Sequence, residues 1–136
     1  MIFENTVIIT ILCTAILFLY LNKPRRIETF TKLTNSRDTI QEVIKRLNKI
    51  FDKHFKFTGT LKMLNNRDIM KEITIEEGKK SFTINKKNVY LCLKDTDTGA
   101  YYDINSLMYV ALHEIAHVLC QEIGHTELFA KIFKAL

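Results

Sequence analysis

The N-terminal apolar segment restricts the architecture most, because residues 6–21 contain no charge, proline or glycine. As a helix this segment would be roughly 24 Å long, or about 30 Å if residues 2–21 all insert, which just spans a bilayer. The segment has no polar face, which disfavours a helix packed inside a soluble core. We therefore expect residues 1–26 to form a transmembrane anchor with a basic flank.

Charges around this segment predict its orientation. Only Glu4 precedes the apolar run, whereas Lys23, Arg25 and Arg26 follow it. A cleaved signal peptide would instead have a basic start and a cleavage site of small residues. The positive-inside rule places everything after the anchor on the cytoplasmic side. The expected location is thus a single-pass membrane protein with a cytoplasmic C-terminal domain, and the membrane could be that of a virion.

The remaining chain is long enough for one domain. Residues 27–35 are predicted to be a polar linker, which leaves residues 36–136 for the folded part. The hydrophobic and charged fractions, 47% and 26%, are ordinary globular values. Three widely spaced cysteines predict no disulfide framework. Residues 1–26 carry +2 of the net charge of +5, so the domain is too weakly basic to indicate a nucleic-acid partner.

Hydrophobic periodicity predicts helices at both ends of this domain. Apolar residues from Ile40 onward recur at helical spacing, which indicates an amphipathic helix of about twenty residues capped by Ser36. A second helix is expected from Asp103 or Asn105 to Gly124. A last helix, residues 127–136, is expected to follow a cap at Thr126.

Between the helices the pattern changes to short strands. The segments that alternate or are rich in β-formers are residues 60–64, 72–76, 81–85 and 88–93. We expect three or four strands, and hence an α+β fold. Residues 88–93 come just before the helix that carries the motif described next, and we expect them to offer an exposed edge to an extended peptide.

The strongest functional signal is the segment His113-Glu114-Ile115-Ala116-His117. Residues four apart lie on one face of a helix, so both imidazoles can point at one metal ion. Glu114 is adjacent but rotated, where it can act as general base on a metal-activated water. A match of this kind arises by chance in very roughly one chain of this size in a hundred. The pattern therefore predicts a Zn²⁺ site with a catalytic glutamate.

A catalytic zinc site needs a third protein ligand and an open position. His125 directly follows Gly124, and a chain that turns at this glycine can fold the imidazole back towards His113 and His117. Three of the four histidines thus fall in one short stretch. We expect His125 to be the third ligand, with Glu127 as the alternative.

Three tyrosines and a cysteine near the motif are further candidates for a role at the metal site. Tyr101, Tyr102 and Tyr109 could each donate to a developing oxyanion, although ordinary packing is the simpler interpretation of Tyr109. Cys120 lies one turn after the second histidine and could approach the metal, but a buried small residue is the commoner role of such a cysteine.

Three segments resemble the minimal zincin domains of WLM and SprT-type metallopeptidases, and small membrane-anchored metallopeptidases of large DNA viruses. They are Val89-Tyr-Leu-Cys-Leu93, Leu112-His-Glu-Ile-Ala-His-Val-Leu119 and Gly124-His-Thr-Glu-Leu-Phe129. The resemblance implies a strand beside the active-site helix, three histidine ligands and a glutamate base. The gap between the second and third histidines is longer here than is usual in those families.

Together these features predict a zinc-dependent endopeptidase anchored in a membrane by residues 6–21, acting on protein or peptide substrates. The leading alternative is a non-catalytic, zinc-stabilised membrane or virion structural component. A membrane-tethered interaction module without metal is a third hypothesis. Metal content separates the third from the others, and substitution of Glu114 separates the first two.

Overall fold

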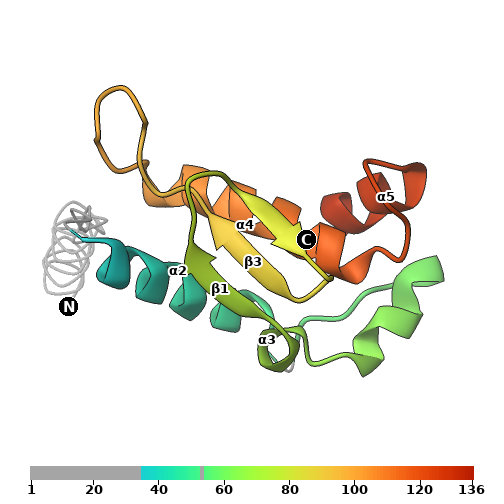
Figure 1. Cartoon of the computed structure of the whole chain (residues 1–136). Coiled ribbons are helices and arrows are strands. Elements are labelled where there is room, and N and C mark those ends of the chain that lie inside the picture. Colours follow the sequence, from blue (N-terminus) through green and yellow to red (C-terminus); the bar gives the residue numbers. More distant parts are fainter. Residues whose placement is uncertain (1–34, 53) are drawn as a thin grey trace, which may run out of the picture. The chain divides into compact units, whose positions relative to one another are not determined.

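Helices and short strands follow one another in the part of the chain that the computed structural model describes, residues 35–52 and 54–136. The elements are the α-helices α2 (Ser36–Ile50), α3 (Ile69–Glu72), α4 (Ile104–Leu119) and α5 (Glu127–Ala135), the 3-10 helix η1 (Gly59–Asn66), and the strands β1 (Thr74–Glu77), β2 (Phe82–Ile84) and β3 (Asn88–Leu91). The expected α+β class is confirmed (Figure 1).

The expected membrane anchor, residues 1–26, lies outside the described residues, as does the expected linker apart from Asn35. Within residues 35–52 and 54–136, none of the helices combines the length and apolar character that crossing a bilayer requires.

Strand β3 is the centre of the sheet, whose order is β1-β3-β2. It pairs in parallel with β1 and antiparallel with β2. Its residues Val89 and Leu91 are almost fully buried, as is usual for a strand with neighbours on both sides. Our expectation that this strand offers an exposed edge is therefore wrong. The sheet edge beside α4 belongs to β2.

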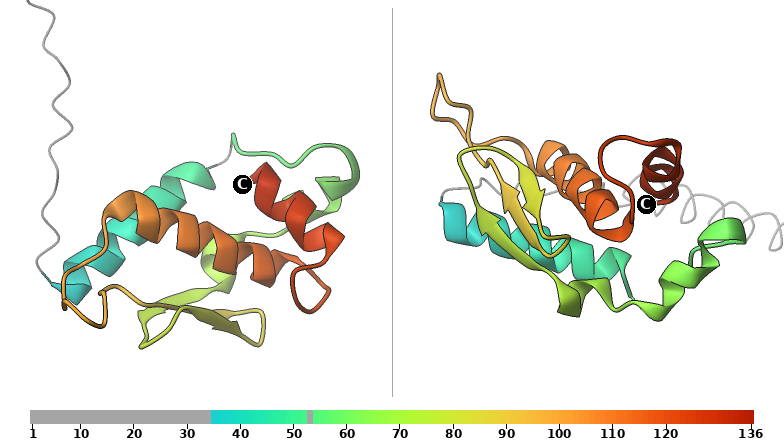
Figure 2. Two further views of the ribbon diagram at one scale, coloured as in Figure 1. Left: turned by 90° about the horizontal axis from the view of Figure 1, so that it is seen from above. Right: turned by 45° about the vertical axis from the view of Figure 1, so that its right-hand side comes forward.

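Two helices cover one face of the sheet (Figure 2). Helix α2 packs against β1 and α4, while α4 packs against β2, β3 and α5. Most of the fully buried side chains lie between these elements: Val43, Leu47, Val89, Leu91, Leu93, Leu107, Ala111, Ile115 and Ile132. Helix α4 therefore runs through the middle of the core and is held on several sides.

Side-chain caps fix where the helices begin. Asp103 accepts hydrogen bonds from the backbone N–H groups of Asn105 and Ser106 at the start of α4. Thr126 accepts one from Phe129 at the start of α5. Both starts were predicted and are confirmed. Helix α2 is capped by Asn35 instead of Ser36. The Asn35 side chain accepts a hydrogen bond from the backbone N–H of Asp38.

Residues 60–64 form η1 and not a strand, so the sheet has three strands. Gly59 begins this segment with a φ of +58°, a left-handed conformation that turns the chain. The Asn65 side chain then bonds both the N–H (2.7 Å) and the C=O (2.9 Å) of Phe57. These bonds connect the chain just before η1 to the last turn of η1.

Candidate metal centre

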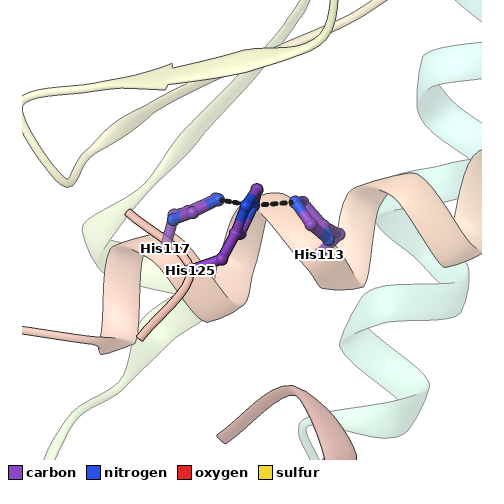
Figure 3. A group of neighbouring side chains, drawn as sticks. All are labelled: His113, His117 and His125. Atoms are coloured by element: carbon purple, nitrogen blue, oxygen red, sulfur yellow. Dashed lines mark hydrogen bonds between the residues drawn. The ribbon is translucent and has the colours of Figure 1, made fainter. Parts of the chain in front are cut away.

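Helix α4 presents His113 and His117 on one face, and the loop after it brings His125 between them (Figure 3). The helix ends at Leu119, before the end that was predicted at Gly124, because Cys120 adopts an extended conformation. The predicted turn at Gly124 is present, with a φ of +85°. The loop can therefore reverse direction, which an unbroken helix up to Gly124 could not do.

The three imidazoles meet at their Nε2 atoms. His125 Nε2 lies 3.0 Å from His113 Nε2 and 3.1 Å from His117 Nε2. The three possible ligand atoms all lie within 4.8 Å of one another, close enough to bind one metal ion. An ion at the usual zinc–nitrogen distance of about 2.0–2.1 Å would separate tetrahedral ligands by roughly 3.3–3.4 Å. The two distances to His125 Nε2 are a few tenths of an ångström shorter than this value.

The chemistry of these nitrogens also fits a cation. An imidazole nitrogen carries either one proton or one lone pair, so it makes one good hydrogen bond. His125 Nε2 faces two such nitrogens at once, and it cannot satisfy both with a single proton or a single lone pair. A metal ion accepts one lone pair from each ring and removes this conflict. The group therefore matches a metal site better than a hydrogen-bonded cluster.

Aromatic side chains of α5 surround the histidines. The ring of Phe129 lies 4.3 Å from that of His117, 4.8 Å from that of His125 and 5.0 Å from that of His113, centroid to centroid. Phe129 is itself buried. Burial is the main cause that lowers the pKa of His113 and His117 below the ordinary histidine value. This shift favours the neutral ring, which is the form that binds metal.

The side chain of Glu114 contacts strand β2 of the sheet. Only 6% of this residue is exposed. Its Oε2 accepts a hydrogen bond of 2.8 Å from the hydroxyl of Thr83 in β2. The same hydroxyl lies 3.2 Å from the main-chain oxygen of Glu114. A carboxylate thus lies next to the candidate metal site, held from the strand side by one hydroxyl group.

The hairpin of β2 and β3 also contacts the loop that carries His125. Asn85 and Lys86 form its turn, with φ values of +53° and +54°. The Lys86 ammonium donates to the backbone oxygen of Glu122 at 2.9 Å. This strand pair therefore contacts both the glutamate of the motif and the loop that brings in the third histidine.

Three tyrosines were considered as oxyanion donors, and the structure places them differently relative to the histidines. Tyr101 and Tyr102 precede α4, and the Tyr101 hydroxyl lies 3.2 Å from that of Ser36 at the start of α2. Tyr109 is one turn before His113, exposed, and packs edge-to-face on Phe133. Among these tyrosines only Tyr109 therefore lies within a helical turn of the histidines.

Cys120 and Glu127 are also placed away from the three nitrogens. Cys120 is 1% exposed and belongs to the hydrophobic core. Glu127 is exposed and forms an ion pair of 3.0 Å with Lys131 on the next turn of α5. The metal-competent group formed by the described residues contains His125 and not Glu127.

Sequence reasoning missed two neighbours of this site, Thr83 and Phe129. Thr83 was assigned to a strand, with no link to Glu114 thirty-one positions later. Phe129 falls within the predicted last helix, but the sequence did not link it to the histidines. The sequence did contain one signal for Thr83, because this polar residue lies between the apolar Phe82 and Ile84 of the strand.

The short loop into α5 makes the Thr126 cap important for stability. We expect Thr126→Ala to lower the free energy of unfolding by about 0.5–2 kcal/mol, because the N–H of Phe129 loses its acceptor. Thr126→Ser keeps the oxygen and should remain close to the wild type. Urea denaturation of the three proteins measures this. Equal stability of the alanine variant would mean that this 3.3 Å bond contributes nothing.

Comparison with known proteins places the chain among viral proteins. It is 46% identical to "Uncharacterized protein 136R" of Invertebrate iridescent virus 6 over 153 aligned positions, which cover 98% of this chain and 86% of that protein. This chain belongs to the 136R family. "Uncharacterized protein 042R" of Invertebrate iridescent virus 3 is 49% identical over 78 residues, which are 57% of this chain and 49% of that protein.

A third relative extends the similarity to another group of viruses. "Uncharacterized protein R325" of Acanthamoeba polyphaga mimivirus is 45% identical over 93 residues, which are 64% of this chain and 46% of that protein. No protein-family model matches the sequence, and no solved structure gives a significant match. The function must therefore be inferred from the residues and geometry of the site.

Proposed function

We propose that this member of the 136R family is a zinc-dependent endopeptidase with a minimal zincin-like domain, similar in its motif to WLM and SprT-type enzymes. One observation carries the proposal: three histidine nitrogens converge on one point beside a buried glutamate of the same helix. A metal site built from three histidines with an adjacent carboxylate is the arrangement of zinc hydrolases.

The residues have separate roles in this proposal. His113, His117 and His125 would hold the ion, and the Phe129 ring, which packs against all three imidazoles, would restrict their orientation. The chemistry that zinc supplies when bound is a lowered water pKa and a polarised carbonyl group. Glu114 takes the proton of the attacking water and delivers it to the leaving amine.

Strand β2 gives a reason to expect an extended peptide as substrate. It is an edge strand, paired only with β3 among the described residues, and it contacts the motif helix through Thr83. A free edge can pair with the main chain of a substrate whatever its side chains are. We therefore propose broad and weak cleavage of accessible segments, with a membrane tether supplying selectivity through local concentration.

A non-catalytic, zinc-stabilised membrane or virion component is the second candidate. The observation in its favour is the burial of Glu114, which is less accessible than the base of an open active site needs to be. The test combines zinc quantitation of the purified full chain with hydrolysis of a mixed peptide library, with and without a chelator. Bound zinc without any hydrolysis would favour this candidate over the peptidase.

We further propose that residues 6–21 anchor the protein in a membrane with the catalytic domain on the cytoplasmic side. We expect the full chain to stay in the membrane pellet after carbonate extraction. A C-terminal tag should be digested by protease added to the cytoplasmic face. A soluble product trimmed at its N-terminus would instead identify the segment as a cleaved signal peptide.

A further inference from the structure

Strand β2 reverses the usual arrangement of apolar and polar side chains. Phe82 and Ile84 are 41% and 42% exposed, whereas Thr83 between them points towards α4. Successive side chains of a strand lie on opposite faces of the sheet, and Thr83 pairs with the buried Val89 of β3. The polar residue therefore occupies the core side, and two large apolar residues face outward.

The Phe82 ring stacks on Tyr90 with centroids 4.9 Å apart, but both outward-facing apolar residues of β2 remain partly exposed. Turning Phe82 and Ile84 inward would bury two apolar side chains, which is the dominant favourable term in folding. Natural sequences tend to break local patterning rules where function requires it. In this strand the residue on the core side bonds to the carboxylate of the motif.

The contact is well placed to hold Glu114. Glu114 is a buried residue, so its carboxylate needs hydrogen-bond donors, and the Thr83 hydroxyl is the side-chain donor that the described residues supply. It binds Oε2 and leaves Oε1 without a side-chain partner among those residues. A carboxylate fixed through one oxygen has its other oxygen at a defined position, ready to accept a proton.

We propose that Thr83 is a positioning residue that holds the Glu114 carboxylate in the orientation that general-base catalysis requires. This inference rests on the proposed peptidase function, and it adds to it a residue outside the motif and outside the metal ligands. The hydroxyl acts through Glu114, so it should affect the rate of the chemical step and not the binding of zinc or of substrate.

The test is steady-state kinetics of the zinc-loaded full chain on a quenched fluorescent peptide that the wild type cleaves. Thr83→Val has nearly the same shape without the hydroxyl, and it should lower kcat about 10- to 100-fold with little change in KM, since small misplacements of a catalytic group have effects of this order. Thr83→Ser should restore most of the rate. Thr74→Val is the matched control, because it removes a strand hydroxyl that bonds Asn88 on the outer face.

Two further measurements separate positioning from a general loss of structure. Zinc affinity, measured by competition with a chromogenic chelator, should be the same in Thr83→Val and wild type. The ¹³C signal of the Glu114 side-chain carboxyl, assigned with Glu114→Gln, should shift in Thr83→Val and return in Thr83→Ser. In the Glu114→Gln background, Thr83→Val should cause no further loss of activity, because the group through which it acts is gone.

The possible failures are distinguishable. Two results would overturn the role of Thr83 and leave the peptidase proposal standing. The first is a Thr83→Val variant as active as wild type. The second is a loss of activity from Thr83→Val that is as large in the Glu114→Gln background as in the wild-type background. A wild type that cleaves nothing when loaded with zinc, or a Glu114→Gln variant as active as wild type, would overturn the peptidase proposal and with it the catalytic role of this contact.

Discussion

Glu114→Gln is expected to lower the rate of peptide hydrolysis by about 10²- to 10⁴-fold, the range that general acid–base catalysis contributes. Glutamine has the same shape and still accepts the hydrogen bond from Thr83, but it cannot take a proton from the attacking water. Zinc content should stay the same, because the three histidine nitrogens do not include this side chain. Peptide cleavage and elemental analysis of the same preparations measure both effects.

A matched control for this variant is Glu76→Gln. Glu76 is exposed on β1, at the sheet edge opposite β2, so the same loss of charge there should leave activity unchanged. A Glu114→Gln variant that binds zinc and cleaves peptides at the wild-type rate contradicts the assigned role. In that case the zinc-stabilised structural protein becomes the better description.

The second large effect is expected for His125→Ala. We expect zinc affinity to fall by more than about 100-fold, because even loss of an outer-shell partner lowers metal affinity 10- to 100-fold. The two histidines left on α4 supply too few protein ligands for a stable site. Competition with a chelator of known affinity measures the change.

His54→Ala provides the control, since His54 is the remaining histidine, is exposed and lies outside the group of three. Its zinc affinity should equal that of wild type. If His125→Ala also keeps its zinc, the third ligand must be another residue. Glu127 would then be tested first, by asking whether Glu127→Ala releases the metal and whether its ion pair with Lys131 can open.

Local sequence patterns predicted much of this molecule correctly. The caps at Asp103 and Thr126 fix the starts of α4 and α5, and capping depends on residues that are neighbours in the chain. The spacing of His113 and His117 is likewise a local property of a helix. These predictions succeeded because each depends on a few consecutive residues.

The errors concern pairings between distant residues. Alternation in residues 60–64 fits a strand, but these residues form a 3-10 helix whose last turn bonds to Phe57 through the Asn65 side chain. The residues at 88–93 were recognised as a strand, yet periodicity does not say which strands lie on either side of it. Its central position is set by its pairing with β1 on one side and β2 on the other, which only the folded chain reveals.

At the candidate site, too, local features were predicted and contacts between distant residues were not. The i, i+4 histidines and Glu114 could be predicted, and the turn at Gly124 that returns His125 was predicted in kind. The end of α4 at Leu119 was not, because Cys120 leaves the helix without a glycine or proline. The contact between Thr83 and Glu114 joins two elements thirty-one positions apart, and no local rule pairs them.

X-ray absorption at the zinc edge tests the central claim most directly, using the purified full chain. The account predicts about one zinc per chain with three imidazole nitrogens at about 2.0–2.1 Å and one further light atom from solvent. The His125→Ala spectrum, if zinc remains, should lose one imidazole. A zinc bound through sulfur at about 2.3 Å, or a full chain that binds no zinc when the metal is supplied, would contradict it.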